Sequence, residues 1–142
     1  MIELLVVLAI ISIVTGLLVT IVYQFLSIPR WGNAQLAVDH DLRNAGLWLM
    51  RDGSESREFT GTPGTCTPFR FDTGRPGVVY TYTRTVDTLN RQDGSQTIGV
   101  ARRVDSVACP SGTVTGTIAI TLISIEGDLS ASQTYTVTMR VD

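Results

Sequence analysis

Residues 4–28 read LLVVLAIISIVTGLLVTIVYQFLSI, an apolar run without a single charged side chain. A helix that spans a bilayer needs about 20 consecutive apolar residues, so this run is long enough to cross a membrane. A cleaved secretory signal would have a basic start, a shorter apolar core and a small-residue cleavage site, and the run has none of these. We therefore expect residues 1–28 to stay on the protein as a hydrophobic helix.

The charges and the cysteines around this run indicate opposite orientations in the membrane. Arg30 follows the run, and the positive-inside rule would place the rest of the chain in the cytoplasm. Cys66 and Cys109 favour the other side, because disulfides persist in oxidising compartments. Removal of a short basic leader from the N-terminus would resolve the conflict, and we expect such a leader.

The two cysteines belong to neither a CxxC motif nor a Cys/His cluster, so no metal site and no cofactor are expected. We expect Cys66 and Cys109 to form a disulfide, and two buried free thiols remain the alternative. Every basic residue of the chain is an arginine, and the net charge is -2. The arginines form no dense block, so the sequence carries no signal for specific nucleic-acid binding.

Glu3 is an ionisable residue at the start of an otherwise uncharged helix, where an unpaired charge is costly. In one interpretation it is a first-turn acid that faces lipid headgroups and complements the helix dipole. In the other it forms a salt bridge with the N-terminal amine of a neighbouring helix in a bundle. The residues alone leave both interpretations open.

The segment MIELLVVLAIISIVTGLLV resembles the mature N-terminus of type IV pilins and pseudopilins, whose hallmark is a glutamate followed by an aliphatic run. The resemblance implies a leader cut by a prepilin peptidase, a methylated N-terminus, an inner-membrane stage, and assembly with pilus machinery into a helical homo-oligomeric filament. Family chains usually carry two more residues before the motif. The resemblance assigns subunit docking to Glu3 and the filament core to its apolar neighbours Ile2, Leu4, Leu5, Val6 and Val7.

A change of helix character is expected after residue 28. Pro29 lacks an amide donor, which predicts a helix break there, and Gly16 is a second expected break. An amphipathic helix is predicted over 29–53, with Val38, Leu42, Ala45 and Leu49 on its apolar face. Asp52 and Gly53 are expected to end it. His40, the only histidine, is expected to have a surface or packing role.

Residues 54–142 are predicted to form a β-domain, which gives the chain an α+β fold with the amphipathic helix packed on an antiparallel sheet. Residues 54–67 are rich in glycine, proline and hydroxyl residues and predict a long loop. Alternating polar and apolar residues, with turn signals at 93–94 and 127–128, indicate the strands. These are expected at 68–72, 78–86, 97–107, 114–125 and 135–141.

The amphipathic helix and the β-domain together also resemble the minor pseudopilins of type II secretion and related minor pilins, through residues 41–45, 69–71, 79–82, 89–91 and 101–107. Together these features predict a structural subunit of an extracellular, cell-surface filament that is membrane-anchored before assembly. A minor tip pilin or pseudopilin that primes assembly or contacts cargo is the alternative, and a solitary membrane-anchored protein is a third possibility. No enzyme motif is recognisable, so catalysis is not expected.

Overall fold

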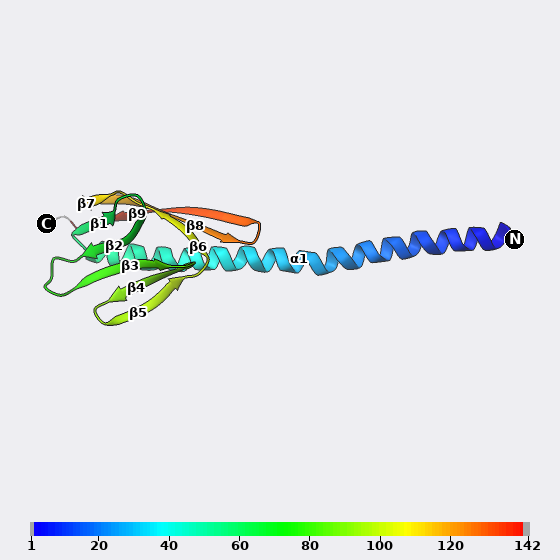
Figure 1. Ribbon diagram of the computed structural model, residues 1–142, viewed down its shortest axis with the longest axis horizontal. Coiled ribbons are helices and arrows are strands. Elements are labelled where there is room, and N and C mark those ends of the chain that lie inside the picture. Colours follow the sequence, from blue (N-terminus) through cyan, green and yellow to red (C-terminus); the bar gives the residue numbers. More distant parts are fainter. Residues whose placement is uncertain (1, 141–142) are drawn as a thin grey trace. The chain divides into compact units, whose positions relative to one another are not determined.

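The computed structural model describes residues 2–140, and for residues 27–31 it describes the backbone alone. One helix, α1, runs from Ile2 to Glu55. The chain divides into two compact units, Met1–Gln35 and Leu36–Asp142. Residues 2–35 of the first unit are helical, and the second unit, called the head below, combines the end of α1 with strands β1–β9 (Figure 1).

The strands of the described head form two antiparallel sheets with the orders β5-β4-β3-β2-β1-β7 and β6-β8-β9. Each strand pairs with its neighbours in antiparallel register, so short turns and hairpins connect most of them. Their bounds are β1 Glu58–Thr62, β2 Cys66–Asp72, β3 Val79–Thr85, β4 Thr88–Asp93, β5 Gln96–Ala101, β6 Val104–Ala108, β7 Gly112–Val114, β8 Thr117–Glu126 and β9 Leu129–Thr138.

The expected α+β architecture is confirmed, because the C-terminal part of α1 packs on the antiparallel sheets. The predicted apolar stripe of this helix is fully buried, with Val38, Leu42, Ala45 and Leu49 at most 2% exposed. Sheet residues complete the same core, among them four aromatic side chains whose rings contact one another: Phe59, Phe69, Phe71 and Tyr82.

Two glycines allow the helix to lie directly against β9. A Cβ atom at Gly46 would overlap the ring of Tyr135, and one at Gly53 would overlap the side chain of Val137. The Tyr135 hydroxyl donates a hydrogen bond to the Leu42 carbonyl at 2.6 Å. Because glycine has no side chain, these positions permit close approach of the helix and the strand.

The helix predictions need two corrections. The helical backbone continues through Gly16 and Pro29, where breaks were expected. A single glycine costs a helix only about 1 kcal/mol, and proline removes one hydrogen bond from a ladder that neighbouring turns maintain. The helix also passes Gly53 and ends at Glu55, because Gly53 supplies space for Val137 and does not act as a left-handed cap.

The strand predictions differ from the structure in several places. The expected strand at 114–125 is divided between β7 and β8, which belong to different sheets, and β9 begins at Leu129, six residues before the expected start of 135–141. The expected loop at 54–67 contains β1, which pairs with both β2 and β7. The expected strand at 97–107 is two strands, since Arg103 adopts a positive φ of 59° and the chain changes sheets there. Residues 88–93 form β4, which had not been predicted as a strand. The turn at 127–128 was placed correctly, and the turn after β4 lies at 94–95, one residue beyond the predicted 93–94.

Candidate functional site: the apolar helix and the contacts that shape the head

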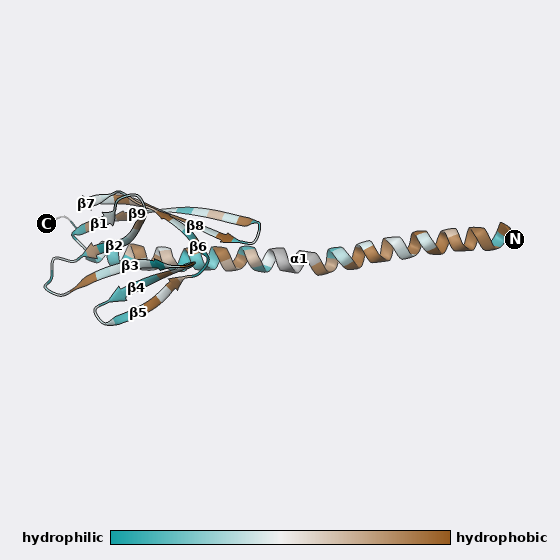
Figure 2. Ribbon diagram, viewed as in Figure 1, coloured by the Kyte–Doolittle hydropathy of each residue, from teal (hydrophilic) through white to brown (hydrophobic). Residues whose placement is uncertain are grey.

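The N-terminal part of α1 presents an apolar surface that its own chain does not cover. Residues Ile2–Leu26 have a mean hydropathy of 3.0, and none of them is buried. Figure 2 shows the hydrophobic colour along most of this segment. The large apolar side chains among them, from Ile2 at 79% to Val14 at 49%, are half exposed or more. By length and composition, the segment is able to span a membrane.

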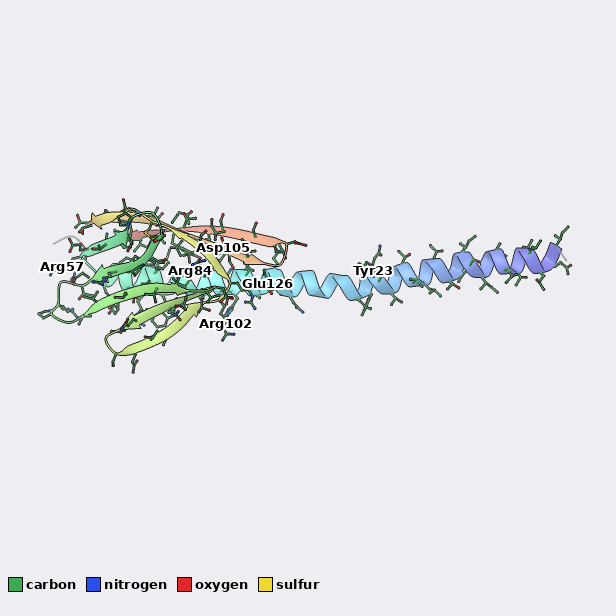
Figure 3. All side chains as sticks on the ribbon, in the orientation of Figure 1. Tyr23, Arg57, Arg84, Arg102, Asp105 and Glu126 are labelled. Carbon is green, nitrogen blue, oxygen red and sulfur yellow. A yellow bond between two sulfur atoms is a disulfide. The ribbon has the colours of Figure 1, made fainter. Side chains whose placement is uncertain are left out.

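Hydroxyl groups in this segment are satisfied within the helix itself. Ser12, Thr15 and Thr20 each donate to the carbonyl four residues earlier, at 2.7, 2.7 and 2.9 Å. A hydroxyl bonded in this way does not need water, so it can enter lipid or a helix bundle at little cost. Tyr23 projects from the helix (Figure 3) and is 73% exposed. The surface of this segment therefore presents apolar side chains together with hydroxyl groups that need no water as a hydrogen-bond partner.

Glu3 lies exposed in the first turn of α1, where its negative charge complements the helix dipole. The five residues predicted to line a filament core, Ile2, Leu4, Leu5, Val6 and Val7, surround it on the same exposed segment and are 52–79% exposed. The placement is compatible with both interpretations of Glu3 from the sequence. The docking role remains a prediction, because a single chain contains no neighbouring helix.

A buried ion pair ties the end of α1 to the larger sheet, and the sequence did not reveal it. The Asp52 carboxylate accepts hydrogen bonds from Arg91 Nε at 2.6 Å, from Arg91 Nη2 at 3.0 Å and from the Tyr82 hydroxyl at 2.6 Å. Asp52 is completely buried, and the Arg91 side chain is 8% exposed. The guanidinium lies 4.8 Å from the Trp48 ring centroid and 4.4 Å from that of Tyr80.

This environment changes the titration of the buried partners. Burial raises the pKa of Tyr82, and the adjacent Asp52 carboxylate raises it further. The hydrogen bonds that Arg91 donates to the Asp52 carboxylate raise the pKa of Arg91, which stays charged. The pairing and the hydrogen bonds compensate the cost of burying these two charges, and the loss of one partner would leave the other uncompensated. From the sequence, Asp52 was interpreted as part of a helix stop signal. Its buried ion pair was missed because its partner, Arg91, lies 39 residues further along the chain.

A second ion pair joins the helix to the smaller sheet. Arg103 Nη1 donates to Asp41 at 2.7 Å, and its Nε lies 2.6 Å from the Glu126 carboxylate. The Arg103 carbonyl accepts from Ser124 Oγ at 2.7 Å and from the Ile125 amide at 3.0 Å. Hydrogen bonding to Asp41 and the charge of Glu126 outweigh the effect of burial, so the pKa of Arg103 is raised. Arg103 thus connects α1, β6 and the β8–β9 hairpin.

The predicted disulfide between Cys66 and Cys109 is present, with Cα atoms 5.5 Å apart. It links the start of β2 to the segment after β6 and so joins the two sheets covalently. Near it, a polar hollow of about 430 Å³ is lined by Gly64, Thr65, Thr67, Arg84 and residues 105–107. Arg84 and Asp105 are labelled in Figure 3. Arg84 donates to the Val104 carbonyl at 3.1 Å, so this side chain serves the fold.

The histidine, cysteine and acidic residues of the described head are the side chains most suited to hold a metal ion. Among residues 2–140, no group of three or more histidine, cysteine, aspartate or glutamate residues is arranged to hold a metal ion. His40 is exposed on α1, with Nδ1 3.9 Å from Asp41. Asp87, Asn90 and Asp93 belong to the β3–β4–β5 meander and its turns.

No family model, curated protein or solved structure matches the chain. The architecture itself is pilin-like: a long apolar N-terminal helix, a helical segment packed on antiparallel sheets, and a disulfide in the C-terminal domain. The disulfide is consistent with an extracytoplasmic location for the head.

Proposed function

We propose that this chain is a structural subunit of an extracellular type IV pilus-like filament, in which the N-terminal helices of many copies pack together. The observation that carries the proposal is the uncovered helix surface of residues 2–26. It bears eighteen large apolar side chains, each about half exposed or more. Soluble monomers rarely expose an apolar patch larger than a few hundred Å², so a surface of this size requires a lipid or protein environment.

Two environments can satisfy this surface at different stages. In a membrane, lipid tails surround the helix, and the internally bonded hydroxyls of Ser12, Thr15 and Thr20 add little cost. Outside the membrane, each exposed Leu, Ile or Val would cost about 1.5–3 kcal/mol in water relative to burial. An extracellular state therefore requires that the helices cover one another, which a helical filament achieves for every copy.

The proposed life cycle follows from these two environments. The chain begins as a membrane-anchored subunit whose leader is removed by a prepilin peptidase, and assembly machinery then transfers it into the filament. Glu3 docks against the N-terminal amine of a neighbour, and the head forms the outer surface. No catalytic activity is included in this proposal, since its chemistry is that of assembly.

The amount of the chain in sheared filaments tests the proposal. Cells that produce the chain are sheared, the released filaments are pelleted, and the subunits in the pellet and the membrane are quantified by mass spectrometry. We expect the chain to be a dominant filament component. If it is present only in trace amounts in the filaments, it is a minor tip pilin or pseudopilin, and if it remains entirely in the membrane, the filament proposal is wrong.

A further inference from the structure

The polar hollow beside the disulfide is lined by residues of both sheets of the head. Its volume is about 430 Å³, a size typical of small-molecule sites. Three segments that are distant in the sequence contribute to it: the turn between β1 and β2, the end of β3, and strand β6. The hollow is therefore a product of the tertiary fold and does not belong to a single loop.

Bonds on one wall hold the hollow in shape. Cys66 lies between the lining residues Thr65 and Thr67, and its disulfide to Cys109 ties this turn to the segment after β6. The Thr65 hydroxyl donates to the Thr67 carbonyl at 3.0 Å, and the Thr67 amide donates to the Thr65 carbonyl at 2.7 Å. A site that is already shaped in this way needs little ordering to accept a ligand, which lowers the cost of binding.

Two opposite charges line the hollow without neutralising each other. Arg84 uses one donor, Nη1, for the Val104 carbonyl at 3.1 Å, whereas a guanidinium has five N–H donors. Among residues 2–140, neither Arg84 nor Asp105 belongs to an ion pair, and the Asp105 carboxylate accepts no hydrogen bond. Both side chains are exposed (Figure 3). Each charge is therefore open to a ligand.

Two hydroxyl groups add neutral hydrogen-bonding capacity to the same hollow. Thr67 and Ser106 are half-buried in its lining, and within the described part of the chain their hydroxyls have no hydrogen-bond partner. Each hydroxyl can donate one hydrogen bond and accept two. None of the lining residues is aromatic, so a ligand would be recognised here by charge and hydrogen bonds and not by ring stacking.

We propose that this hollow binds a small zwitterion, a molecule with one carboxylate and one ammonium group such as a free amino acid. The ligand carboxylate pairs with the Arg84 guanidinium, whose parallel N–H donors match a carboxylate. The ligand ammonium pairs with Asp105. A simple anion would be attracted by Arg84 but repelled by Asp105, and a simple cation would meet the reverse, so the paired charges select a ligand that carries both.

The expected affinity is modest, in the millimolar range, because both charged side chains are exposed and screened by solvent. The hollow lies wholly within the head, and its lining includes no residue of the apolar helix. This inference therefore goes beyond the proposed function and can be tested on subunits that are not assembled.

The test uses the full-length, isotope-labelled chain in detergent micelles, which cover the apolar helix, and follows backbone amide signals by nuclear magnetic resonance. The probes are glycine, β-alanine and γ-aminobutyrate, which carry the two charges at increasing separation. Acetate and methylammonium are the probes with a single charge. We expect at least one zwitterion to shift the signals of Thr65, Thr67 and Ser106 saturably, and to bind about fivefold more tightly than either single-charge probe.

Variants of Asp105 give the decisive comparison. Asp105→Asn should weaken zwitterion binding about fivefold without weakening acetate binding, a split that a misfolded variant could not produce. Asp105→Glu keeps the charge and should keep the binding. Asp128→Asn is the matched control, since Asp128 is an exposed acid in the β8–β9 turn and does not line the hollow.

Three results would each overturn the proposal. The first is the lack of a saturable shift with all three zwitterions. The second is acetate or methylammonium binding as tightly as the best zwitterion, which would make the hollow a site for a single charge. The third is an Asp105→Asn variant that binds the zwitterion as well as the unaltered chain does.

Discussion

Asp52 shows how one residue can determine the fit between helix and sheet. Its carboxylate is completely buried and holds Arg91 and the Tyr82 hydroxyl at 2.6–3.0 Å. In the sequence, Asp52 is simply an acidic residue near the end of a helix. The structure shows instead a buried charge whose partner lies on β4, and removing one member of such a pair leaves the other uncompensated.

We predict that Asp52→Asn lowers the free energy of unfolding by about 3–5 kcal/mol, because Arg91 would remain buried without its counter-charge. Asp93→Asn is the matched control, since Asp93 lies 3.5 Å from the same arginine but is half exposed. Its loss should cost at most about 1 kcal/mol. Chemical denaturation followed by tryptophan fluorescence measures both. Equal costs for the two variants would refute the central role of Asp52.

Glu3→Ala is predicted to reduce filament assembly strongly and to leave membrane insertion and head folding intact. The change makes the helix more apolar, so insertion does not suffer. In the filament, however, a neighbour's terminal amine would be buried without a counter-charge, at about 3–5 kcal/mol per subunit. The ratio of sheared filament to membrane-bound subunit measures the effect. Normal assembly of the alanine variant would reduce Glu3 to a helix-dipole residue.

At the scale of elements, periodic patterns were predictable and long-range contacts were not. The 4-3-4 spacing of Val38, Leu42, Ala45 and Leu49 identified the buried helix face, because it depends only on helix geometry. The alternation in 117–125 identified β8 in the same way. The N-terminal helix, its apolar surface and the disulfide partners were likewise accessible from local sequence and residue count.

The missed features depend on residues that are distant in sequence. β1 lies in a stretch of glycine, proline and threonine that is typical of a loop, and it is a strand because β2 and β7 pair with both of its sides. Gly53 has the sequence signature of a helix cap, yet Val137, from β9, occupies the space beside it. Partners supplied by the tertiary fold overrode local propensity in both cases.

The disulfide should stabilise the head through the loop that it closes. Cys66 and Cys109 are separated by 43 positions, and closing a loop of this length contributes about 4 kcal/mol on the chain-entropy estimate. We predict that the Cys66→Ser, Cys109→Ser double variant loses about this amount while keeping its secondary structure. Thermal unfolding of the variant, beside the reduced and oxidised unaltered chain, measures it. A loss below about 1 kcal/mol would show that the sheets do not depend on this link.

At the scale of the whole molecule, the two units meet different physical requirements. The head buries its own core, with large side chains such as Tyr82 and Phe69 fully enclosed. The first unit has no buried side chain in residues 2–26. The head therefore encloses its own core, whereas the apolar side chains of residues 2–26 need lipid or other protein to cover them.

Deleting residues 1–28 should leave a soluble head that unfolds cooperatively, because the helix stripe that covers the sheets begins at Val38. Thermal unfolding monitored by circular dichroism, with sedimentation to detect aggregates, tests this prediction. Aggregation of the deleted chain without a cooperative transition would contradict a separable head.

The measurement that tests the filament account most directly is an electron cryomicroscopy reconstruction of filaments sheared from cells that produce this chain. The account predicts a central bundle of helices whose density fits residues 2–26, with the exposed apolar side chains of the single chain buried against neighbouring copies and the head outside. A filament whose core density fits a different chain, or whose subunits contact one another only through their heads, would contradict it.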